Sequence, residues 1–107
     1  MVLQRFDKLR ILNLSYSKFQ TTPDFTQLLG LEKLSLTSCS NLLKVHPSIG
    51  LLAKLIHLDL RDCNKLRSLP STICNLTTLR QLDLDLCSSF DCLPEHLGDM
   101  KGLTELN

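Results

Sequence analysis

Tryptophan is absent from this 107-residue sequence, and tyrosine occurs only once. No apolar run approaches the roughly 20 residues that a membrane-spanning helix needs. An excess of one charge sign is also missing, because 12 Lys and Arg balance 11 Asp and Glu. The charge balance therefore gives no reason to expect nucleic acid or an anionic membrane as a partner. The first ten residues contain several charges and lack the apolar core of a signal peptide. We expect a soluble chain of the cytoplasm, or of the cytoplasm and nucleus.

Cysteine is present in an odd number, five residues, which argues against a secreted scaffold held by disulfides. Cys39, Cys63 and Cys87 follow one another at intervals of 24 residues. We expect these three thiols to form a buried column of small, weakly hydrogen-bonding side chains. Cys74 and Cys92 lie outside that column, and we expect them to be the more reactive thiols if either faces solvent.

Leucine supplies 27 of the 107 residues, and its spacing repeats. The stretch 55–78, LIHLDLRDCNKLRSLPSTICNLTT, opens with the pattern L-x-x-L-x-L. The alternation at Leu58 and Leu60 is typical of a short strand with one buried face. Apolar residues then follow every three or four positions, as expected for a chain that coils around a narrow core. One such coil cannot bury its leucines alone, so several copies must stack.

The copies start near residues 9, 31, 55 and 79, and a partial copy starts at 103. We predict an α/β leucine-rich-repeat solenoid, with a parallel β-sheet on the concave face and short helical, 3₁₀ or loop segments on the convex face. We expect residues 1–107 to form a single domain of this kind, a fragment without caps. The register predicts one stack containing Leu34, Leu58 and Leu82, and a second stack containing the leucines two residues further on.

Four prolines mark the start of the convex arcs, at positions 23, 47, 70 and 94. Proline fixes its own φ and biases the residue before it toward extended backbone, so each arc should begin extended. We expect a short helical turn at 71–76, with Ser71 as its N-cap. No arc is long enough for an extended helix.

The exposed face of the predicted strands is polar and differs from coil to coil. Asp59 and Asp83 should be neighbours across the sheet, with Arg61 beside Asp85. Like charges directly opposite each other are destabilising, and basic neighbours and solvent must offset them. This face is either a solvated polar surface or a recognition surface for a protein partner. Its candidate binding residues are Lys33, His57, Asp59, Arg61, Gln81, Asp83 and Asp85.

The residues give little support for catalysis, and we expect no enzyme, no cofactor and no metal. Cys87, Cys92 and His96 have a spacing that zinc ligands can show, but Cys87 should be buried in the thiol column while His96 lies along the arc. His57 lies two residues from Asp59 and near Cys63, yet Cys63 follows the bend and should point inward. A cysteine–histidine pair is therefore not expected.

The sequence as a whole resembles the leucine-rich repeats of plant intracellular immune receptors of the TIR nucleotide-binding class, the disease-resistance proteins. The resemblance rests on an L-x-L-x-x-C step, followed by Asn or Ser and an L-P-x-x-I arc. The strings TPDF, VHPSIG, LRDC and SLPS are especially similar, and the resemblance covers nearly the whole chain.

This resemblance implies a protein-interaction module in plant defence. Its partners would be a pathogen effector, a guarded host protein, or the receptor's own other domains, which the repeats help to hold inactive. The NAD and nucleotide chemistry of such receptors belongs to domains with no counterpart in these residues. An alternative function is substrate recognition for a ubiquitin ligase, which an F-box-like segment before the repeats would favour. A secreted receptor ectodomain is third, and its usual G-x-I-P arc is replaced here by Leu-Pro.

Overall fold

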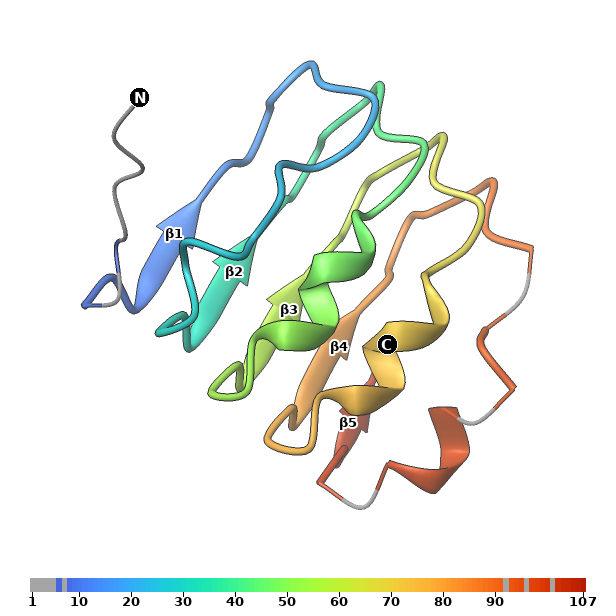
Figure 1. Cartoon of the computed structure of the whole chain (residues 1–107). Coiled ribbons are helices and arrows are strands. Elements are labelled where there is room, and N and C mark those ends of the chain that lie inside the picture. The colour runs from blue at the N-terminus through green and yellow to red at the C-terminus, as the bar shows by residue number, and fades with distance from the viewer. Residues whose placement is uncertain (1–5, 7, 92, 96, 101) are drawn as a thin grey trace.

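The computed structural model describes residues 6, 8–91, 93–95, 97–100 and 102–107. Its strands form one parallel sheet in the order β1-β2-β3-β4-β5. Three short 3₁₀ turns form a second row on the opposite side of the core (Figure 1). The elements are β1 (Ile11–Asn13), β2 (Lys33–Ser35), η1 (Pro47–Leu51), β3 (His57–Asp59), η2 (Ser71–Asn75), β4 (Gln81–Asp83), η3 (Leu97–Asp99) and β5 (Glu105–Leu106). The predicted solenoid class, with its parallel sheet and short convex turns, is confirmed.

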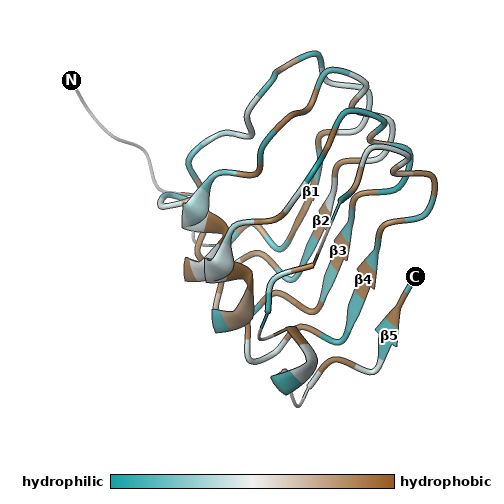
Figure 2. Cartoon of the chain, turned by 90° about the vertical axis from the view of Figure 1, so that its right-hand side faces the viewer, coloured by the Kyte–Doolittle hydropathy of each residue, from teal (hydrophilic) through white to brown (hydrophobic). Residues whose placement is uncertain are grey.

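The strands pair so that one leucine from each coil stands in register with the next. Leu34 pairs with Leu58, and Leu58 pairs with Leu82. These three side chains are at most 1% exposed, which confirms the predicted stack. Figure 2 shows the resulting alternation on β3 (His57–Asp59) and β4 (Gln81–Asp83), where a hydrophobic position lies between two hydrophilic ones. Because the leucines point into the core, the residues on either side of them must point outward onto the concave face.

The convex turns differ in one detail from the expectation. η2 begins at Ser71, but its N-cap is Pro70, whose backbone is extended, and no side chain caps the turn. Ser71 as N-cap is therefore wrong, because the extended proline places Ser71 inside the first turn. η1 is capped by a side chain, since His46 Nδ1 accepts a hydrogen bond from the Ser48 backbone N–H at 3.1 Å. Among the described residues, no helix is long and apolar enough to cross a membrane.

The thiol column follows the core along the carboxyl ends of the strands. Cys39 and Cys63 are fully buried, as expected, while Cys87 is only half-buried. Each thiol donates to the backbone carbonyl of a leucine in the preceding coil, over 3.0–3.4 Å. In the first coil Ser17 takes the same place, and its hydroxyl donates to the Leu14 carbonyl at 2.6 Å. Cys74 is half-buried, and Cys92 lies outside the described residues.

A feature that the sequence did not predict lies immediately before this column. Four residues there adopt left-handed backbone with φ between 58° and 64°, although none of them is glycine. The backbone N–H of the first three donates to the next coil at 2.8–2.9 Å, which keeps these residues in register. We call the four residues the rim, and it borders the concave face: Tyr16, Ser38, Asp62 and Leu86.

Candidate functional site

The concave face contains all seven predicted site residues. Lys33, His57 and Gln81 share one row across β2, β3 and β4, and Asp59 and Asp83 share the next row. Arg61 and Asp85 lie just beyond the ends of β3 and β4. The 24-residue period therefore brings residues from three coils onto one continuous surface.

Asp59 and Asp83 are direct partners in the register between β3 and β4, as predicted. They are not solvated, however, because only 7% of Asp59 and 4% of Asp83 is exposed. Of the two interpretations of this face, a solvated polar surface does not describe these two positions. Neighbouring polar side chains bind both carboxylates, and those neighbours rather than water satisfy their charge.

Arg61 neutralises Asp59. Its Nη2 and Nε donate to the two carboxylate oxygens at 2.9–3.2 Å, and its backbone N–H donates to Oδ1 at 3.1 Å. Burial raises the pKa of the Asp59 carboxyl, but the hydrogen bonds and the charge of Arg61 outweigh burial and leave this pKa below its ordinary value. The fork geometry is the strong bidentate type, and it fixes the guanidinium against the sheet.

Asp83 is held by three neighbours from different coils. His57 Nε2 lies 2.9 Å from Oδ2, and the Gln81 side-chain amide donates to both oxygens at 3.1–3.2 Å. The Asn107 side-chain amide also donates to Asp83. Burial raises the pKa of the Asp83 carboxyl, yet the bonds from His57, Asn107 and Gln81 together lower it below its ordinary value. The register explains the His57 contact, because one 24-residue period plus a two-residue step makes it diagonal to Asp83.

Arg61 and Asp85 are neighbours along the ladder, as predicted, since the backbone N–H of Asp62 donates to the Asp85 carbonyl at 2.8 Å. The guanidinium nevertheless binds Asp59. Asp85 and Lys33 are exposed, and within the described part of the chain neither has an ion-pair partner. The face therefore has a closed network at its centre and unpaired charges around it.

Comparison with known proteins agrees with this geometry. The Leucine Rich Repeat family model matches residues 54–76, which contain β3 and η2. A leucine-rich-repeat protein of Leptospira interrogans superposes with a TM-score of 0.61 at 27% identity, covering 94% of this chain and 31% of that chain. The fold of this chain is that of a leucine-rich-repeat solenoid.

The resemblance of this solenoid to plant resistance proteins is also confirmed. Over 49 residues it is 51% identical to TMV resistance protein N of Nicotiana glutinosa. The match spans 45% of this solenoid and 4% of that protein, so it covers a small part of the relative's length. Leucine-rich-repeat solenoids are protein-interaction folds, and their side chains on the concave sheet vary while the leucines stay fixed.

One metal-ligand combination occurs among the described residues of the solenoid. His57, Asp59 and Asp83 each offer a ligand atom, and these atoms lie within 4.8 Å of one another. Each atom already has a partner, and a metal ion would have to displace Arg61 from Asp59. The geometry therefore favours an ion-paired network. Of the three residues considered as zinc ligands, Cys92 and His96 lie outside the described residues.

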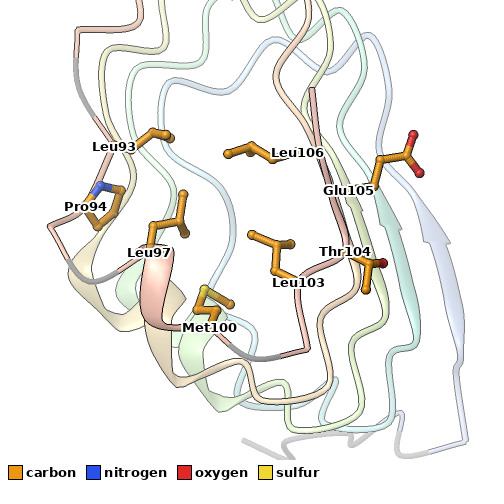
Figure 3. Close-up of a pocket in the computed structure, with 9 residues that line it drawn as sticks. Leu93, Pro94, Leu97, Met100, Leu103, Thr104, Glu105 and Leu106 are labelled. Carbon is orange, nitrogen blue, oxygen red and sulfur yellow. The ribbon is translucent and has the colours of Figure 1, made fainter.

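A cavity of about 400 Å³ lies away from the concave face, between η3 and β5. Leu103 and Leu106 face Leu93, Leu97 and Met100 across it (Figure 3). This lining is apolar apart from Thr104 and Glu105 at its edge. Among the described residues, Thr104 and Glu105 are therefore the polar side chains of a lining that otherwise continues the stacked core.

Proposed function

We propose that this solenoid is a protein-interaction module in plant defence, and that its concave face recognises the partner. The partner would be a pathogen effector, a guarded host protein or another domain of the same receptor. The observation behind this proposal is a polar face whose residues change from coil to coil over an invariant leucine stack. The match to a plant resistance protein supports the defence role.

The network at the centre of the face supports recognition by preorganisation. Arg61 is bound to Asp59 on one side, yet its side chain remains 52% exposed and can donate further hydrogen bonds. Lys33 and Asp85 extend from either side of this network with no ion-pair partner among the described residues. A rigid surface with charges of both signs gives specificity and faster association with a complementary protein, rather than affinity for any polyanion.

Several further properties belong to the same proposal. We propose that the solenoid acts without catalysis or a cofactor, and that it works in the cytoplasm or in the cytoplasm and nucleus. We also propose that residues 1–107 act as one repeat domain with coils starting near 9, 31, 55, 79 and 103. Nothing in the geometry favours the ubiquitin-ligase alternative.

The proposal is tested with charge reversals at exposed positions. Lys33→Glu and Asp85→Lys should each weaken binding to an effector, or to the receptor's other domains, in titration calorimetry. Unfolding free energy should stay within about 0.5 kcal/mol, as is usual for surface changes. Lys54→Glu is the matched control, because Lys54 is exposed but follows η1 on the convex side. Equal effects of all three variants would contradict a concave binding site.

A further inference from the structure

The rim contains two residues with bulky side chains in an unfavourable left-handed backbone conformation. Tyr16 and Leu86 both have φ of 64°, a left-handed conformation that favours glycine or asparagine and disfavours bulky side chains. Ser38 and Asp62 occupy the same place in the coils between them. Aspartate tolerates this backbone comparatively well, so the strain is greatest at the two ends of the rim.

These two bulky side chains gain almost no stability from burial in the folded chain. Tyr16 is 73% exposed and Leu86 is 74% exposed, the highest values among the large exposed hydrophobic residues of the described chain. Neither side chain belongs to the apolar core or packs against it. A strained residue that buries almost nothing in its own chain points to a contact outside the chain.

The rim is a regularly repeated row. Tyr16 donates through its backbone N–H to the Thr37 carbonyl at 2.9 Å, and Ser38 and Asp62 repeat this bond one coil further on each time. Adjacent parallel strands lie about 4.8 Å apart, so three steps separate Tyr16 from Leu86 by roughly 14 Å. An extended chain covers about 13 Å in four residues, and its residues i, i+2 and i+4 face the same side.

The charge between the two apolar ends is negative. Asp62 accepts a hydrogen bond from the Ser38 hydroxyl at 2.9 Å, and Asp85 directly precedes Leu86. Within the described residues, neither carboxylate has an ion-pair partner, and the Arg61 guanidinium, whose charge also interacts with Asp85, is bound to Asp59. A partner segment that crosses the rim would therefore meet an apolar side chain, then carboxylates without an ion-pair partner, then a second apolar side chain.

We infer that the rim binds an extended segment of the protein partner, with two apolar residues four positions apart and a lysine or arginine midway between them. The apolar residues would contact Tyr16 and Leu86, and the cation would contact Asp62 and Asp85. This inference rests on the proposed function and specifies the chemistry of the partner. It also extends the binding surface from the concave face to the rim.

A synthetic peptide tests the inference directly. The probe is acetyl-Gly-Leu-Thr-Lys-Thr-Leu-Gly-amide, titrated into the ¹⁵N-labelled 107-residue chain and followed by amide chemical shifts. The shifts should concentrate at residues 15–17, 37–39, 61–63 and 85–87. Replacing the central lysine by glutamate should weaken binding about fivefold, as should removing one threonine, because the second leucine then faces the opposite side. Higher salt should weaken binding of the lysine peptide.

Variants of the chain separate binding from folding. Tyr16→Asn and Leu86→Asn remove the apolar contacts while fitting the left-handed backbone better, so the melting temperature should stay or rise while peptide affinity falls about fivefold. Leu51→Asn is the control, since Leu51 is an exposed apolar residue in η1, on the convex side. The affinity of the Leu51→Asn variant for the peptide should be unchanged.

The inference is overturned if the shifts map away from the rim, or if Leu86→Asn binds the peptide as tightly as the unaltered chain does. The proposed function has a separate readout in the charge reversal at Lys33, which is not among the contacts inferred for the rim. If that reversal weakens binding to a protein partner while the rim variants have no effect, the concave site stands and the rim is not part of it.

Discussion

Two carboxylates stand opposite each other in adjacent strands, and different neighbours stabilise each of them. Like charges directly opposite on a sheet repel, and burial removes the water that would otherwise weaken the repulsion. Arg61 binds the carboxylate of Asp59 within one coil. The carboxylate of Asp83 is instead bound by side chains from three coils, His57, Gln81 and Asn107. The centre of the concave face is thus held by contacts between coils as well as by the leucine core beneath it.

The pH dependence of stability should reveal these two carboxylates. The pKa of Asp59 and of Asp83 is lower in the folded state than the ordinary value of 3.8. Their contribution to the unfolding free energy is therefore complete above about pH 5 and is lost as pH falls through 3.8 toward the lowered values. In urea unfolding from pH 6 to pH 2.5, Asp59→Asn and Asp83→Asn should each flatten this loss. Slopes that match the unaltered chain would mean that the two pairs do not persist in solution.

Thiol chemistry distinguishes the members of the cysteine column. The neighbouring Cys63 thiol lowers the pKa of the half-buried Cys87 to about 7, against the effect of burial, while the pKa of Cys63 is raised by its proximity to Cys87 and by burial. Only the thiolate reacts readily. In native chain at pH 7.5, a thiol reagent should therefore label Cys87 well before Cys39 and Cys63. Mass spectrometry of the labelled peptides would measure this, and Cys87→Ser should remove the fast-reacting site of the column. Equal labelling of all three would contradict the structure.

At the scale of elements, the leucine period was sufficient to predict the strands and their register, because a fixed spacing allows one way of stacking coils. It could not predict the closure of the concave network. That closure depends on side-chain rotamers, such as the turn of Arg61 toward Asp59 rather than Asp85. The left-handed rim was also missed, since three of its four residues are poor indicators of that backbone. A pattern of Gly or Asn at those positions would have been the usual signal.

The packing of the convex turns predicts that alanine will affect stability differently at two glycines. A Cβ atom added at Gly50 in η1 would lie 2.6 Å from the backbone oxygen of Thr72 in η2. The backbone of Thr72 can move aside only at a cost in free energy. Gly50→Ala should therefore destabilise the chain by about 1–3 kcal/mol. Gly98 in η3 has open space around its added Cβ, and Gly98→Ala should be neutral or slightly stabilising. Chemical denaturation of both variants gives the comparison. A Gly50→Ala variant as stable as the Gly98→Ala variant would mean that η1 and η2 do not stack closely.

At the scale of the whole molecule, the surface beside β5 resembles the interior of the solenoid. Leu97, Met100, Leu103 and Leu106 line the cavity beside β5, and 45% of Leu106 is exposed. Inside the solenoid, the equivalent residues Leu34, Leu58 and Leu82 each pair with a leucine in the next coil and are buried. The described edge of the sheet at β5 also offers backbone groups that the inner strands use for pairing. Both features favour contact with another polypeptide.

Residues 1–107 expressed alone should therefore associate as their concentration rises. Light scattering over a wide concentration range should show the mean mass increasing, because apolar surface and an unpaired strand edge gain by covering each other. Leu106→Lys places a charge on the surface beside β5 and should reduce this association. Leu51→Lys adds the same charge on the convex side and should leave it unchanged. The four stacked coils exceed the three that a stable array needs, so the chain should stay folded throughout. A single monomeric mass at every concentration would show that the surface beside β5 is not adhesive, and that the stacked coils are sufficient by themselves.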